Sequence, residues 1–207
     1  MIQQIKSFCE NLAHSTHEIS EERKEVLNQF SKAIQQDLKQ FGSVKIIYVC
    51  THNSRRSHFG QIWSKVAATY FNVGNVETFS GGTEATALNP NAIQALKEQG
   101  FQITSNEVDS ENPVYLVDFG EKEKIVCFSK VYDHEVNPKS DFIAVMTCSD
   151  AEENCPFIPG VSFRIATTYE DPKKFDNTPL QESKYLERSR QIALESIYVF
   201  SKIKTDE

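Results

Sequence analysis

The chain has 207 residues and a formal net charge of −7 at pH 7. This length accommodates one well-packed α/β domain without requiring a second, and the acidic balance argues against a nucleic-acid surface, which would leave a basic patch. No apolar run approaches a membrane span, and the start MIQQIK lacks a secretory signal, so a cytoplasmic protein without a membrane or nucleic-acid partner is expected.

Residues 1–42 are predicted to form a helical extension. Apolar residues recur at helical spacing in two runs, Ser15 and Ser20 are suited to cap a new turn between them, and Gly42 is suited to end the second run. The apolar face is expected to pack on the remaining domain, residues 43–207, or on a second subunit in a homodimer. His14 and His17 lie three residues apart with no further ligand in register, so no metal site is predicted there.

Strand and helix patterns alternate after residue 43. Apolar runs predict strands at 44–49, 76–79, 142–146 and 161–165, and helical periodicity predicts helices at about 57–71, 91–99 and 184–202. The alternation favours a parallel sheet covered by helices on both faces, a three-layer α/β/α domain with its active loop at the carboxyl end of a strand. The segment 113–132 breaks the alternation, and its two apolar runs, 114–117 and 124–128, predict an inserted β-hairpin.

The segment directly after the first strand has the order of an oxyanion-binding loop. It reads Cys-Thr-His-Asn-Ser-Arg-Arg-Ser, from Cys50 to Ser57. Backbone N–H groups of a loop that runs into a helix favour a bound anion, and the same surroundings favour the thiolate form of a cysteine. Arg56 can bind two oxygens of a tetrahedral anion with its fork, and Ser57 is placed to stabilise the thiolate. The alternative is a buried core cysteine beside a polar turn.

We therefore predict that Cys50 is a nucleophile inside this loop. Asn53 and Ser80 are expected to hold the shape of the loop through side-chain hydrogen bonds. The residues expected to line it are Thr51, His52, Asn53, Ser54 and Arg55.

The loop resembles that of the low-molecular-weight protein tyrosine phosphatases and of the thioredoxin-coupled arsenate reductases. Trp63, the segments 79–84 and 88–93, and Asp171-Pro172 extend this resemblance over roughly residues 44–205. It implies the α/β fold of these phosphatases, no tightly bound cofactor, and Asp171 as the group that donates a proton to the leaving oxygen and then activates water. The alternative for Asp171 is an ordinary solvent-facing Asp-Pro turn.

Two further cysteines distinguish the two kinds of relative. The segment 147–156, with Cys148 and Cys155, looks like the redox segment of the thioredoxin-coupled arsenate reductases. The resemblance implies that Cys50 attacks arsenate, that Cys148 then attacks Cys50 and expels arsenite, and that Cys155 attacks Cys148 to leave a bridge that thioredoxin reduces. The alternative is that Cys148 is a core cysteine and Cys155 is incidental. Cys9 and Cys127 lie on apolar faces and are assigned to packing.

The spacing of these cysteines implies motion. Residues seven apart on a helix are separated by about 10.5 Å of rise, whereas a disulfide needs Cα atoms within about 7 Å. The segment 149–155 is therefore expected to unwind when a Cys148–Cys155 bridge forms.

Several residues depart from the pattern of the relatives. Lys173 and Lys174 follow the Asp-Pro pair, where the tyrosine phosphatases usually have aromatic residues, and this favours a small inorganic oxyanion as substrate. His52 stands where the family usually has glycine. Gln61 occupies the position of a glutamate that binds potassium, together with the loop asparagine, in some of the reductases, so a potassium site is left open.

The sequence favours an arsenate reductase that uses a disulfide relay. A low-molecular-weight tyrosine phosphatase or small phosphoester phosphatase is the alternative. A non-catalytic oxyanion- or redox-sensing module is a third reading, against which the intact nucleophile, arginine and acid argue.

Overall fold

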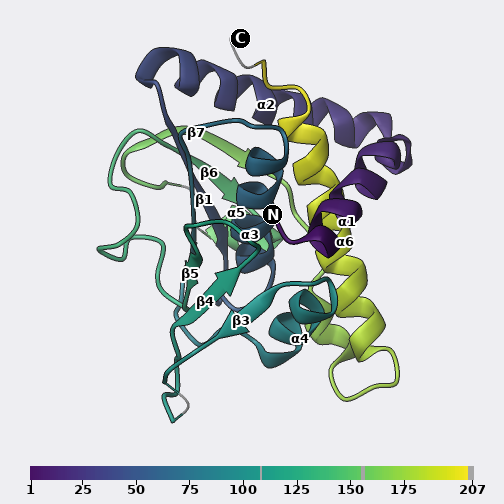
Figure 1. The fold of residues 1–207 in the computed structure, drawn as a ribbon. Helices are drawn as coiled ribbons and strands as arrows, with labels where there is room; N and C mark the ends of the chain where they lie inside the picture. Colours follow the sequence, from purple (N-terminus) through teal and green to yellow (C-terminus); the bar gives the residue numbers. More distant parts are fainter. Residues whose placement is uncertain (108, 155–156, 205–207) are drawn as a thin grey trace.

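The computed structural model describes residues 1–107, 109–154 and 157–204. Its centre is a sheet of four parallel strands in the order β2-β1-β6-β7 (Figure 1). In chain order these strands are β1 (Val44–Cys50), β2 (Val76–Gly82), β6 (Phe142–Met146) and β7 (Val161–Ala166). All four predicted core strands are thereby confirmed. Because β1 lies between β2 and β6, the loop that follows β1 begins at the carboxyl end of a central strand.

Helices cover the two faces of this sheet unequally. One face carries three long helices, α2 (Glu21–Phe41), α3 (Arg56–Tyr70) and α6 (Gln181–Phe200), against which α1 (Gln3–His14) and α4 (Pro90–Glu98) pack from outside. The other face is covered by the short helix α5 (Ser149–Asn154) and by irregular segments. The predicted three-layer arrangement is confirmed, although the helical layer on the α5 side is thin.

The two sheet faces alternate along each strand, as the two-residue period requires. Ile46, Tyr48 and Val145 belong to the core beneath the long helices, whereas Ile47 and Val49 belong to the smaller core beneath α5.

The N-terminal helices are part of the main core. The expected cap at Ser20 is present, since its Oγ accepts a hydrogen bond from Arg23 N at 3.2 Å, and Gly42 ends α2 in the left-handed conformation with φ of 71°. Ser15 stands at the N-cap position of the short 3₁₀ turn η1 (Thr16–Glu18), but its side chain donates to Asn11 O and makes no cap hydrogen bond. The buried apolar side chains of the two helices are Ile5, Cys9, Leu12, Leu27, Phe30 and Ile34.

The apolar face of the extension therefore packs within its own chain. A homodimer through these helices and the division of the chain at residue 42 stay predictions.

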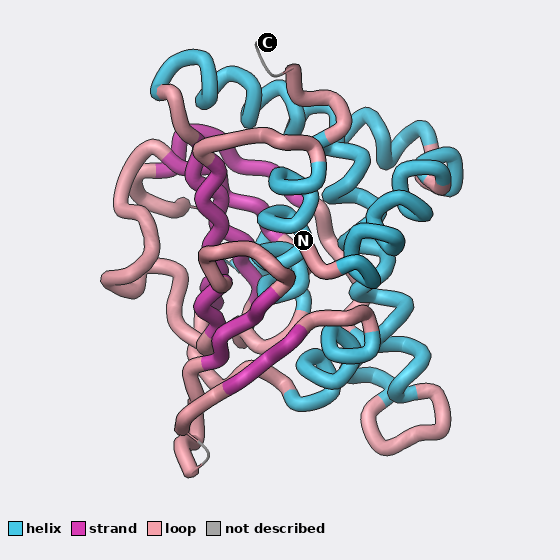
Figure 2. Tube along the Cα trace, viewed as in Figure 1, coloured by secondary structure: helices cyan, strands magenta, loops and turns pink. Residues whose placement is uncertain are grey.

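The predicted hairpin is confirmed and has a third strand. β4 (Tyr115–Asp118) and β5 (Ile125–Cys127) pair antiparallel, and β3 (Gln102–Thr104) pairs with the other edge of β4 (Figure 2). The sequence did not predict β3, because three residues that follow a helix stop show no measurable period.

Among the described helices, none is long and apolar enough to cross a membrane.

Candidate active site

The loop between β1 and α3 turns its carbonyl groups outward. Cys50 O accepts from Thr83 N at 3.2 Å, and Thr51 O accepts from Glu84 N at 2.8 Å. Farther along the loop, His52 O accepts from Thr86 Oγ1 and from Ser129 Oγ. Asn53 O accepts from His58 Nε2, and Ser54 O accepts from Asn89 N. With these carbonyls bound outside, the loop N–H groups are left for its interior, which is the arrangement that binds anions.

Gly82 is where the loop rests on β2. A Cβ atom at this position would lie 2.6 Å from Thr51 O and 2.8 Å from Asn53 N. The loop backbone approaches so closely that any side chain at position 82 would displace it.

Ser57 contacts the Cys50 sulfur and is itself held by Asn53. Cys50 Sγ lies 3.1 Å from Ser57 Oγ, and Asn53 Nδ2 donates to that same oxygen at 2.8 Å. Because the Asn53 amide supplies the proton in its own bond, the Ser57 hydroxyl keeps its proton for the sulfur. Ser57 is thus oriented to donate to a Cys50 thiolate.

Buried neighbours hold Asn53 in the left-handed conformation, with φ of 43°. Its Oδ1 accepts from Lys130 N at 2.8 Å, and its carbonyl accepts from His58 Nε2 at 3.0 Å. Burial, with a smaller effect of the Lys130 charge, lowers the pKa of His58 to about 3, so the ring is neutral. Since Nε2 carries the proton, Nδ1 accepts from Ser80 Oγ at 3.3 Å. Ser80 therefore supports the loop through a side-chain hydrogen bond to His58, which in turn binds Asn53 O.

Two arginines at the end of the loop hold Asp171. Arg56 Nη2 lies 2.6 Å from Asp171 Oδ2, and Arg55 Nε lies 2.8 Å from Asp171 Oδ1. Arg56 Nη1 donates to Tyr169 O at 2.8 Å, whereas the buried Arg56 Nε has no hydrogen-bond partner among the described residues. The resting site thus offers a free donor and a carboxylate that an incoming anion must replace.

The charge state of Asp171 follows from these neighbours. Burial acts to raise the pKa of Asp171, but the charges of Arg56 and Arg55 outweigh it and hold this pKa below its ordinary value. The carboxyl group is therefore ionised at neutral pH in the resting state. It borders a shallow hollow whose walls are Cys50, His52, Ser54, Arg55, Arg56 and Asp171.

Cys148 lies beside the loop. It follows β6, the direct neighbour of β1, and its Sγ lies 3.4 Å from Thr51 Oγ1. Ala151 N, in the first turn of α5, approaches the same sulfur at 3.4 Å. Cys50 and Cys148 are thus brought to one edge of the sheet by parallel pairing. Cys155 lies outside the described residues.

The other two cysteines are packing residues, as predicted. Cys9 and Cys127 are fully buried in the main core, and burial raises the pKa of each thiol to about 12. A thiol with such a pKa is a poor nucleophile at neutral pH.

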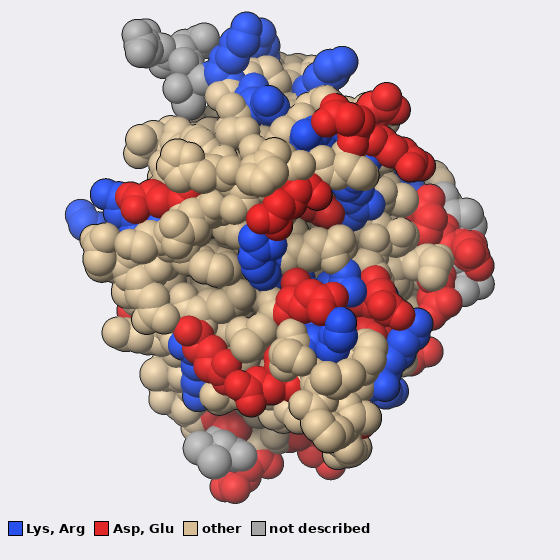
Figure 3. Space-filling model, turned by 90° about the vertical axis from the view of Figure 1, so that its right-hand side faces the viewer, with Lys and Arg blue, Asp and Glu red and all other residues tan. Residues whose placement is uncertain are grey.

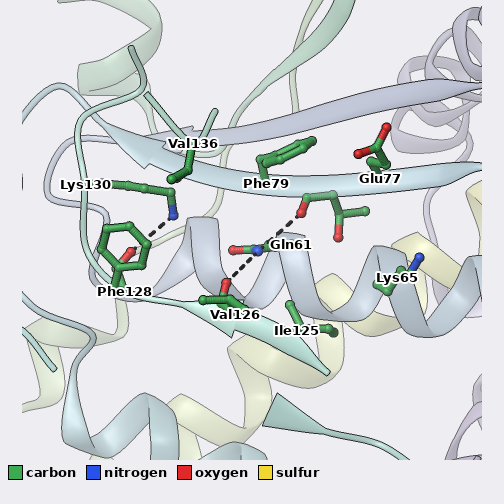
Figure 4. Close-up of a pocket in the computed structure, with 10 residues that line it drawn as sticks. Gln61, Lys65, Glu77, Phe79, Ile125, Val126, Phe128, Lys130 and Val136 are labelled. Carbon is green, nitrogen blue, oxygen red and sulfur yellow. Dashed lines mark hydrogen bonds between the residues drawn. The ribbon is translucent and has the colours of Figure 1, made fainter. Parts of the chain in front are cut away.

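Gln61, at the position where a potassium site was left open, joins the two sheets. Its Nε2 donates to Thr78 O at 3.3 Å and to Val126 O at 3.2 Å, across the groove between β2 and β5 (Figure 4). Asn53 Oδ1 is engaged by Lys130 N. That oxygen and Gln61 Oε1 are the atoms with which the two side chains would contact a cation, and Gln61 Oε1 accepts from Cys127 Sγ at 3.9 Å.

Three residues of the site have no signal in the sequence. The side chain of His58 binds a loop carbonyl, while the backbone of Lys130 and of Tyr169 binds side chains of Asn53 and Arg56. In each case the partner is remote in sequence or lies on another element. Lys130, for example, binds a residue 77 positions earlier. No periodicity or motif spacing indicates such a pair.

Comparison with known proteins finds arsenate reductases among the relatives of this chain. No family model matches. An arsenate reductase of Oceanobacillus iheyensis is 31% identical over 162 residues, which cover 77% of this chain and 97% of the relative. An arsenate reductase of Bacillus subtilis is 28% identical over 147 residues, 70% of this chain and 87% of the relative.

A solved structure supports the fold. The low-molecular-weight phosphotyrosine phosphatase of Vibrio cholerae O395 aligns with a TM-score of 0.51 at 13% identity, over 77% of this chain and 95% of that one. This likeness concerns the fold alone.

Proposed function

The chain belongs to the arsenate reductase family, and we propose that it reduces arsenate to arsenite with Cys50 as nucleophile and an intramolecular disulfide relay. The observation that carries this proposal is the position of Cys148, whose sulfur lies 3.4 Å from Thr51 Oγ1, one residue from the nucleophile. Phosphoester hydrolysis needs no second thiol at this place, whereas a reductase does.

Arsenate binds where the loop N–H groups and Arg56 converge. The anion displaces Asp171 from the Arg56 fork and takes up the free Arg56 Nε. The Cys50 thiolate, held by Ser57, then forms a bond to arsenic while one arsenic-bound oxygen leaves with a proton. Asp171 is ionised while both arginines hold it, and its pKa rises once the anion takes its place on Arg56. It can then take up a proton from solvent and pass it to the leaving hydroxyl, which departs as water.

The relay accounts for the two electrons that arsenic gains. The Cys148 thiolate attacks Cys50 Sγ, a disulfide forms, and the electron pair of the sulfur–arsenic bond leaves with arsenic as arsenite. Cys155 then attacks Cys148 and releases the Cys50 thiolate. An external dithiol, which we propose is thioredoxin, reduces the Cys148–Cys155 bridge. Because residues 149–154 form α5 in the reduced protein, this bridge requires α5 to unwind.

Phosphoester hydrolysis is the second candidate. It is favoured by one observation, the hollow in which Cys50, Arg56 and Asp171 meet, because nucleophile, arginine and acid suffice for that reaction. In this reading Asp171 activates the water that releases the thiophosphate.

One preparation tests both functions. Arsenate-dependent oxidation of reduced thioredoxin is measured beside hydrolysis of p-nitrophenyl phosphate, with the wild type, Cys50→Ser and Cys148→Ser. The reductase proposal expects arsenate turnover that both substitutions abolish. Hydrolysis by the wild type and by Cys148→Ser, with no arsenate turnover by either, would leave only the phosphatase.

A further inference from the structure

We infer that Arg23, in the N-terminal extension, is a positioning residue for the active site, and this inference rests on the proposed function. Arg23 lies in α2 and binds Glu195 of α6 with both ends of its fork, at 3.1 Å from Nε to Oε1 and 2.9 Å from Nη2 to Oε2. Tyr169 donates its hydroxyl proton to Glu195 Oε2 at 2.6 Å. A continuous chain of hydrogen bonds therefore runs from the extension to the loop that carries Asp171.

Tyr169 is the point at which this chain meets the reacting groups. Its carbonyl accepts from Arg56 Nη1 at 2.8 Å, and its N–H donates to Thr147 O at 3.1 Å, directly before Cys148. It also precedes Asp171 by two residues. The backbone of one residue thus sets the position of the anion-binding arginine, of the acid and of the second cysteine.

The Tyr169 side chain is held from two sides. Its hydroxyl binds Glu195, and the Arg23 guanidinium lies 5.0 Å from the centroid of its ring. Burial, reinforced by the Glu195 charge, raises the pKa of Tyr169, so the phenol remains a donor. Arg23 also neutralises Glu195, which is only 4% exposed and would otherwise be a costly buried charge.

A second ion pair supplies a matched control. Arg190 of α6 binds Glu18 of the extension through Nη1 at 2.9 Å and Nη2 at 3.0 Å, which is also a two-bond contact between the same two parts of the chain. This pair is about two-fifths exposed, and among the described residues it forms no hydrogen bond with the active-site loop. The helical face on which the extension lies carries interspersed acidic and basic side chains (Figure 3). Both pairs attach the extension, but within the described residues only the Arg23–Glu195 pair contacts Tyr169.

The test compares Arg23→Lys, which keeps the charge but loses the fork, with Glu18→Gln. Tyr169→Phe is a second variant that removes only the hydroxyl. Binding of phosphate is titrated by calorimetry in a Cys50→Ser background, and kcat and KM for arsenate are measured in the otherwise wild-type chain. Thermal melting shows that each variant is folded.

We expect Arg23→Lys and Tyr169→Phe each to weaken phosphate binding and raise KM for arsenate by about 3- to 30-fold, the range that residues of one hydrogen-bond network reach. Their effects in the double variant should fall short of the product, because both interrupt one chain. Glu18→Gln should change neither quantity by more than about twofold.

Folded Arg23→Lys and Tyr169→Phe proteins that match Glu18→Gln in both measurements would overturn the inference, as would independent, multiplying effects. Phosphate binding separates this failure from that of the proposed function. If the wild type reduces no arsenate, the coupling of Arg23 to the anion site is still read from the phosphate titration.

Discussion

Asp171→Asn should tighten the binding of a tetrahedral anion while slowing turnover. In the resting protein Asp171 occupies Arg56 at 2.6 Å and Arg55 at 2.8 Å, so an anion has to displace it. An asparagine keeps the shape of the side chain but not the charge that competes for Arg56. Turnover falls because the amide has no proton to give to the leaving oxygen.

The size of the effect follows from the bond that the anion replaces. A hydrogen bond between charged groups contributes about 1.5–3 kcal/mol, and about 1.4 kcal/mol corresponds to a factor of ten in Kd. The Asp171 side chain is 22% exposed, so solvent weakens the pair only in part. We take the lower end of the range and expect Kd for phosphate to fall about tenfold.

Calorimetric titration with phosphate and with sulfate measures this change, in a Cys50→Ser background that prevents chemistry. Glu84→Gln is the control, since Glu84 also carries a negative charge at the rim but is 67% exposed and 3.8 Å from His52 Nε2. It should leave Kd within about twofold. The reasoning is refuted if Asp171→Asn binds phosphate no more tightly than the wild-type side chain, or if Glu84→Gln gives the same gain.

Four further outcomes are expected. Cys50→Ser should abolish both arsenate reduction and p-nitrophenyl phosphate hydrolysis, because the alcohol provides no stabilised anion at neutral pH; a near-normal rate of either reaction would contradict this. Gly82→Ala should abolish anion binding in calorimetry, since the added Cβ would lie 2.6 Å from Thr51 O and push the loop away. Normal phosphate affinity would show that anion binding does not depend on this close contact between the loop and β2. The depressed pKa of Asp171 means that its carboxylate stabilises the fold above the ordinary pKa of 3.8, and that this contribution is lost as the pH falls through the lower folded-state pKa. In melting curves below about pH 4, the wild type should therefore lose more stability than Asp171→Asn. Equal losses of stability in the two proteins would contradict a stabilising role of the Asp171 carboxylate. Amide exchange in residues 149–154 should accelerate on oxidation while α3 stays protected, because α5 has to unwind; unchanged exchange would argue against the bridge.

The features that the sequence predicted are those set by local order. Cys50 ends the strand β1 and Arg56 begins the helix α3, so the strand, loop and helix could be placed from neighbours alone. Parallel pairing of β1 with β6 then brings Cys148 to the same edge, as the alternation of strands and helices allows.

The features that it missed depend on contacts between remote segments. The role of His58 requires burial and a carbonyl from the loop, and Ser80 acts through that ring. The Arg23–Glu195–Tyr169 chain joins three elements, and each member alone is an ordinary residue of a helix or loop. Nothing in the spacing of these residues indicates that they meet, because packing of α2 and α6 decides it.

Disulfide mapping after one turnover tests the central claim most directly. The Cys155→Ser variant, fully reduced, is mixed with one equivalent of arsenate without thioredoxin, and its peptides are analysed by mass spectrometry while released arsenite is quantified. The relay predicts about one arsenite per chain and a bridge between Cys50 and Cys148, with Cys9 and Cys127 still reduced. No arsenite and no Cys50–Cys148 bridge, in a protein that still hydrolyses p-nitrophenyl phosphate, would contradict it.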